Sequence, residues 1–192
     1  MRKFLFVVIA AMFTLGAVPC FATTCSVVYS GPFAWYQCIN NPYFYQTMSP
    51  WTYAPSGNAD YTHSGEQMCG TGWSSFAKST GAYGYETIEQ QFTTDTSAQN
   101  NFSIALTVDL LHSHSYSGNR MAIVINNVTD GTFETIANID GANGDICGRT
   151  YQFSLFRPSW AGKTLKLSIQ EQFWNSDTQI DVSGASFIQR IY

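Results

Sequence analysis

The chain has 192 residues, of which 11% are charged and 16% are aromatic, and its formal net charge is −4 at pH 7. An acidic chain with few basic residues lacks the positive surface that attracts nucleic acids and anionic membranes, so partners of these kinds are not expected. With so few charges, the polar surface has to come from Ser, Thr, Asn, Gln and Gly. This composition is typical of exported β proteins.

Residues 1–22 have the features of a secretory signal peptide. Arg2 and Lys3 precede an apolar run over residues 4–18, and a small residue, Ala22, follows. A membrane-spanning helix needs about 20 apolar residues, so this shorter run predicts export and not membrane insertion. We expect cleavage after Ala22, a mature single domain over residues 23–192, and a secreted, extracellular or periplasmic location.

Cleavage leaves four cysteines, which in an exported chain predict two disulfide bonds. Three pairings are compatible with four cysteines. We favour Cys25–Cys38 and Cys69–Cys147, because the first pair flanks two short apolar runs around residues 30–32 that are typical of a hairpin.

The next segments mix aromatic residues with turn-forming residues. Trp35 and Trp51 are assigned to packing. Residues 55–65 are rich in Gly, Ser, Asn and Asp, and together with residues 69–75 they predict a long loop.

The clearest strand covers residues 102–110, FSIALTVDL. Every second residue from Phe102 to Leu110 is large and apolar, and the residues between them are smaller or polar. This period of two predicts a strand with one face in the core. A similar alternation with Ile88, Gln90 and Phe92 on one parity predicts another strand over residues 83–92.

Shorter runs of the same kind follow, and no segment shows a sustained helical period. The predicted strands lie at residues 121–126, 132–139, 151–156, 165–170 and 180–191. Short strands separated by turns predict an all-β fold, an antiparallel β-sandwich of jelly-roll type. We expect one domain with its core module at about residues 40–190 and a disulfide-pinned hairpin before it.

The residues that alternate with the core residues along these strands are of types that bind sugars. Flat aromatic rings stack on sugars, while amides and carboxylates bind hydroxyl pairs. The alternative is an ordinary solvated sheet face. The residues on this parity are Tyr83, Tyr85, Glu89, Gln91, Thr107, Asp109, Arg120, Asn126, Lys166, Gln170 and Gln172.

Three aromatic residues in predicted loops offer a second place for a ligand. Trp73, Tyr116 and Trp174 each lie near Gly, Ser or Asn. Loops often carry binding residues because the scaffold holds them in place. The alternative is that each ring caps one end of the core.

The sequence carries none of the common catalytic motifs, such as G-x-S-x-G or H-E-x-x-H. If the protein were a glycoside hydrolase or lyase, Glu89 and Asp109 would be the carboxylate pair, provided that their strands are neighbours. A third hypothesis is an adhesive protein that binds another protein chain. We favour a non-catalytic protein that binds carbohydrate or a cell-surface polymer; the sequence makes no prediction about oligomeric state.

Several segments together resemble the galactose-binding-like jelly rolls, which include many carbohydrate-binding modules. Residues 40–51, NNPYFYQTMSPW, are similar in spacing to an early pattern of those families, N-G-x-F-E-x-G-x-x-x-x-W. Residues 88–93, the turn at 161–165 and the closing strand at 180–187 resemble later segments. The resemblance implies a lectin-like sandwich that binds carbohydrate.

The resemblance also bears on cofactors. Many of these modules hold a structural calcium ion, bound partly by the early Glu and by a late Asp. Phe44 stands at the position of the Glu, and Asp181 is the late carboxylate candidate. A hard cation needs about six to eight oxygen ligands, so the loss of one carboxylate leads us to expect no bound cofactor.

Overall fold

The computed structural model describes residues 23–29, 35–67, 70–96, 101–111, 120–140, 146–173 and 179–190. For some strand residues, among them 58–67, 70–82 and 109–111, it describes the backbone alone. Within the described residues the regular structure is β-strand apart from one 3-10 turn, η1 (Pro158–Trp160). No helix in these ranges is long and apolar enough to cross a membrane. The predicted signal peptide lies outside the described residues.

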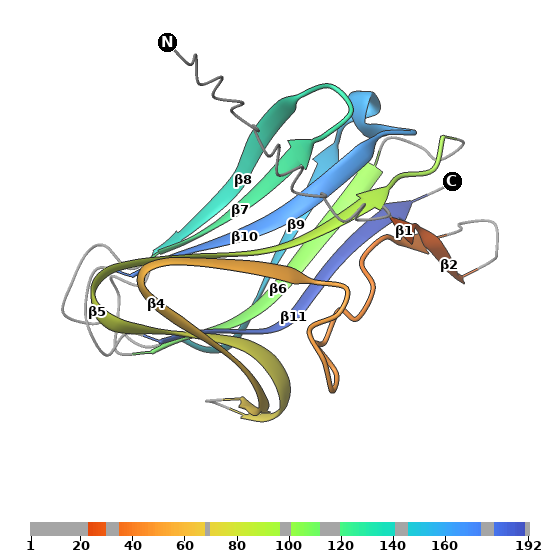
Figure 1. Ribbon diagram of the computed structural model, residues 1–192. Helices are drawn as coiled ribbons and strands as arrows, with labels where there is room; N and C mark the ends of the chain where they lie inside the picture. Colours follow the sequence, from red (N-terminus) through yellow and green to blue (C-terminus); the bar gives the residue numbers. More distant parts are fainter. Residues whose placement is uncertain are drawn as a thin grey trace, which may run out of the picture.

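The strands form two layers, which is the β-sandwich that the alternation predicts (Figure 1). Sheet one is antiparallel, and β1 (Thr23–Thr24) pairs in parallel with the end of its second strand. Its order is β4 (Thr52–Gln67), β5 (Gly70–Thr93), β10 (Thr164–Phe173), β7 (Arg120–Asn127) and β8 (Thr132–Asp140).

Sheet two is also antiparallel and lies behind sheet one in Figure 1. Its order is β2 (Ser26–Tyr29), β3 (Trp35–Gln37), β11 (Gln179–Arg190), β6 (Asn101–Leu111) and β9 (Ile146–Phe156). The two sheets are joined along β5, because its first part pairs with β11 and its last part pairs with β10.

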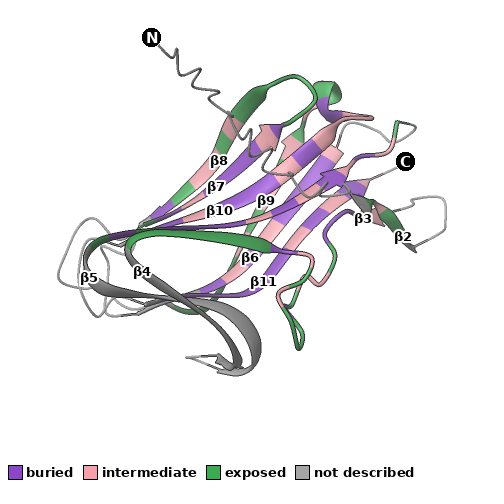
Figure 2. Cartoon of the chain, in the orientation of Figure 1, coloured by how far each residue is buried: buried purple, intermediate pink, exposed green. Residues whose placement is uncertain are grey.

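The core lies between the layers and follows the predicted parity. Phe102, Ile104, Leu106 and Val108 of β6 are all buried, as are the alternating apolar residues of β7 and β10 (Figure 2). The ring of Phe187 fills the centre, because it lies 4.6 Å from the Phe92 ring and 5.5 Å from the Phe102 ring, centroid to centroid. Aromatic pairs at these separations add to the free energy of burial.

Two buried glutamines fasten connecting segments to the core. Gln90 accepts a hydrogen bond from the backbone N–H of Asn40 at 2.7 Å and donates one to its carbonyl at 2.9 Å. Gln189 makes the same pair of bonds with the backbone of Asp95, at 2.8 and 2.9 Å. Each buried amide is thereby satisfied, so its burial carries little penalty.

The segment 40–51 closes one end of the sandwich. Phe44 is fully buried, and its ring centroid lies 5.1 Å from that of Trp51. The indole N–H of Trp51 donates to the Asn41 carbonyl at 3.0 Å. The packing role predicted for Trp51 is therefore confirmed. The same prediction for Trp35 is wrong, because this ring is 42% exposed and lies beneath Arg190 at 5.3 Å.

The predicted N-terminal hairpin is confirmed. β2 and β3 pair in antiparallel fashion, and Cys25 and Cys38 form a disulfide bond across them. Cys147 is also disulfide-bonded. Its predicted partner, Cys69, lies outside the described residues.

The long loop predicted for residues 55–65 and 69–75 is wrong. β4 covers most of this region, and β5 begins at Gly70. β4 pairs with β5 at the edge of sheet one, where backbone hydrogen bonds are sufficient and an apolar face is not needed. Gly57, with a φ of +66°, accompanies a register shift in this pairing.

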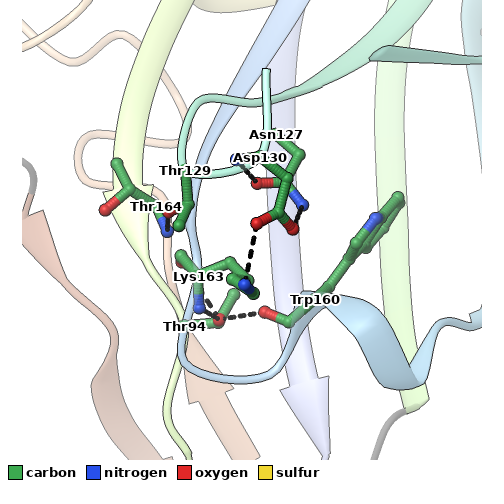
Figure 3. A network of polar contacts seen from close by, with 7 residues as sticks. All are labelled: Thr94, Asn127, Thr129, Asp130, Trp160, Lys163 and Thr164. Atoms are coloured by element: carbon green, nitrogen blue, oxygen red, sulfur yellow. Dashed lines mark hydrogen bonds and ion pairs between the residues drawn. The ribbon is translucent and has the colours of Figure 1, made fainter. Parts of the chain in front are cut away.

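A polar network ties the ends of three strands together near η1 (Figure 3). The backbone N–H of Lys163 donates to the Thr94 hydroxyl at 3.0 Å, and that hydroxyl donates to the Trp160 carbonyl. The Lys163 ammonium donates to Asp130 at 2.8 Å, in the turn that follows Asn127. This hydrogen bond holds the pKa of Asp130 below its ordinary value.

Candidate functional site

The pairing of β5, β10 and β7 aligns polar side chains in rows on the solvent side of sheet one. Gln172 of β10 lies opposite Tyr85 of β5 and also opposite Arg120 of β7. Three strands thus contribute one aromatic ring, one amide and one guanidinium to a single row. Their neighbours along each strand, such as Glu171 and Met121, are fully buried on the core side. We call this solvent side the outer face.

A groove with a volume of about 320 Å³ lies on this outer face, at the end that carries Tyr85. Its two walls come from β5 and β8, and its floor comes from β10 and β7. The lining residues are Tyr85, Arg120, Ala122, Thr135, Asn138, Gln170 and Gln172.

The side chains of the groove leave their hydrogen-bonding groups at the surface. Arg120 is exposed and donates from Nε to Gln172 Oε1 at 2.7 Å. Tyr85 is 39% exposed, so part of its ring is open to solvent. Ala122 lies next to Gln170 in the register and has only a methyl group, which leaves space above the floor. The groove therefore combines a ring surface with amide and guanidinium groups, the set that binds sugar rings and hydroxyl groups.

At the other end of the outer face, the polar side chains are hydrogen-bonded to one another. Lys166 Nζ donates to Glu89 Oε2 at 2.6 Å, and the hydroxyl of Ser168 lies 3.4 Å from Glu89 Oε1. Asn126 donates in turn to that hydroxyl at 3.1 Å. Glu89 and its neighbours thus satisfy one another, and they are less free to bind a ligand than the groove residues are.

Most residues predicted for a binding face are brought together by the structure. Tyr85, Glu89 and Gln91 of β5 share the outer face with residues of β10 and β7. Those residues are Lys166, Gln170, Gln172, Arg120 and Asn126. The shared face follows directly from the period of two in each strand.

Thr107 and Asp109 are not on this face, and their expected place beside Glu89 is wrong. Both belong to β6, which pairs with β11 and β9 in sheet two. Asp109 lies opposite Asp181 instead. The chain crosses from sheet one to sheet two between β5 and β6, so strands that are consecutive in the sequence are not neighbours. Glu89 and Asp109 therefore lie on strands of different sheets.

The structure places only some of the aromatic residues that are predicted to bind a ligand. Tyr83 is exposed on β5, with a φ of +63°. Trp73 lies on β5 among the residues described by their backbone alone. Tyr116 and Trp174 lie outside the described residues.

Three groove residues were missed by the sequence reasoning. Ala122 of β7 and Thr135 and Asn138 of β8 line the groove. Residues 132–139 were recognised as a strand, but their partner was not. The register of β8 also shifts beside Ile123, so parity alone would have assigned these side chains poorly.

Asp181 is fully buried. Among the described residues no group of three or more His, Cys, Asp or Glu side chains is arranged to hold a metal ion. The galactose-binding-like jelly rolls that the sequence resembles often carry a calcium-binding Glu in the early segment. In this protein the buried ring of Phe44 occupies that position, and it supplies no oxygen ligand.

The fold and the position of the groove define a class of protein: an antiparallel β-sandwich with a polar, aromatic-edged groove across the outer face of one sheet. No protein-family model matches the chain, and no curated protein matches it either.

Several solved structures share the fold. One is TmCBM61 in complex with β-1,4-galactotriose, with 8% identity and a TM-score of 0.54 over 78% of this chain and 95% of that chain. A family 16 carbohydrate-binding module has 10% identity and a TM-score of 0.55 over 78% of this chain and 97% of the module. A third comes from work on promiscuous carbohydrate-binding modules of the β-sandwich superfamily, with 10% identity and a TM-score of 0.52 over 81% and 72% of the two chains. The predicted antiparallel β-sandwich of jelly-roll type is thus confirmed as the fold, and these modules share it.

Proposed function

We propose that this protein binds carbohydrate in the groove on the outer face of sheet one, and that it does so without catalysing a reaction. The observation that carries this proposal is the row of Tyr85, Gln172 and Arg120, held in register across three strands. A sugar ring stacks on an exposed aromatic face while amide and guanidinium groups bind its hydroxyls. The named ligands of structures with this fold support the same class of ligand.

The absence of catalysis is supported by the surroundings of Glu89. Its carboxylate is engaged by Lys166 at 2.6 Å, and Asp109, the other acid considered for a catalytic pair, belongs to sheet two. Glycoside cleavage needs two carboxyl groups on either side of one bond. Polysaccharides that bind the protein should therefore show no new reducing ends after prolonged incubation.

The Tyr85→Ala variant tests the binding site. We expect affinity for a bound glycan to fall by about tenfold or more, because an aromatic stacking surface contributes about 0.5–1.5 kcal/mol beyond its buried area. A glycan array identifies the ligand, and calorimetry compares the variants.

Tyr43→Ala is the matched control, because Tyr43 is 70% exposed and lies beside Gly184 of sheet two. This variant should bind like the parent. If Tyr43→Ala abolishes binding and Tyr85→Ala does not, the ligand binds to sheet two and the proposed groove is wrong.

We infer that the protein is exported, as its first 22 residues predict. The Cys25–Cys38 disulfide supports this, because disulfide bonds persist in oxidising compartments. Mass spectrometry of the protein recovered outside the cytoplasm should give the mass of a chain that begins at Thr23. Recovery of the full-length chain in the cytoplasm, with reduced cysteines, would contradict export.

A further inference from the structure

The groove carries one positive charge and no negative charge among its lining residues. Arg120 is the sole ionisable group in the lining besides the Tyr85 phenol. The chain as a whole has 13 acidic and 9 basic residues. The groove thus presents a cation with no carboxylate among its lining residues, and this cation lies where we place the ligand.

The other described arginines already have partners. Arg157 binds the Glu134 carboxylate through Nε, at 3.1 and 2.9 Å from its two oxygens. Arg149 and Arg190 lie over the rings of Tyr151 and Trp35, at 5.2 and 5.3 Å. Lys163 and Lys166 are likewise paired with carboxylates.

Arg120 differs from Arg157 and the two lysines because its hydrogen-bonded partner is a neutral amide, and from Arg149 and Arg190 because it lines the groove. Its Nε donates to Gln172 Oε1 at 2.7 Å. Its Nη groups have no acceptor among the residues whose side chains the structure describes, a set that does not include Asp140. A guanidinium has five N–H donors in a planar fork that matches a carboxylate in a two-bond arrangement. Since Gln172 already holds one donor, less side-chain freedom is lost when a ligand binds the others.

We propose that the groove prefers acidic glycans, with a uronate carboxylate bound by the Nη groups of Arg120. This inference rests on the proposed carbohydrate-binding function. Tyr85 and Arg120 are two strands apart, at about 10 Å for strands spaced by about 4.8 Å. The sugar stacked on Tyr85 and the uronate at Arg120 are therefore different residues of one oligosaccharide.

Two acidic residues, Glu171 and Asp140, lie on strands next to Arg120. Glu171 is on the core side of β10 beneath the groove, and burial raises its pKa well above the ordinary value, which favours the uncharged acid. Asp140 of β8 lies opposite Arg120 in the register. The Asp140→Asn variant therefore belongs in the test.

The test compares matched ligands that differ only in charge. Calorimetry measures the binding of oligogalacturonate and alginate oligomers, and of the same oligomers after chemical reduction of their carboxyl groups. We expect the disulfide-intact protein to bind at least one acidic oligomer about tenfold more tightly than it binds the same oligomer with reduced carboxyl groups. Arg120→Gln should abolish this difference, and Arg120→Lys should restore only part of it because an ammonium cannot make the two-bond contact. Asp140→Asn should preserve or increase the difference.

The outcomes separate the two proposals. If acidic and reduced forms bind equally, or if Arg120→Gln weakens both equally, then Arg120 binds hydroxyl groups and the preference for acidic glycans is wrong, while carbohydrate binding stands. If no glycan binds in the array, the proposed function itself fails. Unchanged thermal unfolding of the Arg120 variants shows that lost binding is not lost folding.

Discussion

Three carboxyl groups, those of Glu86, Glu171 and Asp181, are fully buried on β5, β10 and β11. Glu171 lies opposite Glu86 across two paired strands. Neither carboxyl oxygen of Glu171 has a hydrogen-bond partner among the described residues. Burial raises the pKa of Glu171, and the neighbouring carboxyls of Glu86 and Asp181 raise it further. An ionised Glu171 would be costly here, so the protein folds most readily with this group protonated.

This arrangement makes the free energy of unfolding depend on pH. Between the pKa of Glu171 in the unfolded chain and its higher pKa in the folded protein, the folded state binds more protons than the unfolded state. The free energy of unfolding therefore falls as the pH rises through that interval. The side chain introduced by Glu171→Gln is neutral at every pH, so this variant should lose the contribution of Glu171 to the pH dependence and be more stable than the parent at pH 8. Urea unfolding between pH 4 and pH 8 measures both effects.

Glu134 provides a control of opposite sign. The hydrogen bonds from Arg157 hold the pKa of Glu134 below its ordinary value, so its contribution is present at neutral pH and is lost as the pH falls. Glu134→Gln should therefore be slightly less stable than the parent at pH 8 and approach it in acid. If Glu171→Gln is instead less stable than the parent at pH 8, Glu171 is ionised and paired in the folded protein.

At the scale of elements, the N-terminal hairpin is attached to sheet two by few contacts. β3 has three residues, and its pairing with β11 runs from Ile188 to Arg190. A two-stranded hairpin of this size is marginal alone. The Cys25–Cys38 bond closes a loop with a sequence separation of 13, and it fixes the hairpin beside the core.

Replacement of both Cys25 and Cys38 by Ala should lower the free energy of unfolding by about 3 kcal/mol, because the unfolded chain is then no longer constrained. Glycan affinity should stay the same, since the hairpin belongs to sheet two and the groove to sheet one. Urea unfolding and calorimetry on one preparation test both statements. A loss of affinity with intact folding would show that the hairpin contributes to the site.

At the scale of the whole molecule, the alternation of side chains was sufficient to predict the sandwich. It predicted the buried face of β6 and assigned Tyr85, Gln170 and Arg120 to the solvent side of their strands. Parity is a local property that does not specify which sheet a strand joins. For that reason Asp109 was expected beside Glu89, although its strand pairs in sheet two.

The remaining differences have the same physical origin, namely pairing between distant strands. β4 is polar and rich in Gly and Ser, and its pairing with β5 depends on backbone hydrogen bonds that leave no mark in the hydrophobic pattern. Thr135 and Asn138 both reach the groove, although their parities differ, because the register between β8 and β7 shifts between them. A register of this kind depends on contacts that no short window of sequence contains.

The groove is built on β10 and β7, each of which is hydrogen-bonded on both sides within sheet one. Its backbone is therefore preformed, unlike that of a site made of loops, and a bound ligand need not order any main chain. What binding immobilises is a small set of side chains, with Gln170 and Gln172 among them, at about 0.5–1.5 kcal/mol for each. Binding then loses no further free energy to the ordering of main chain.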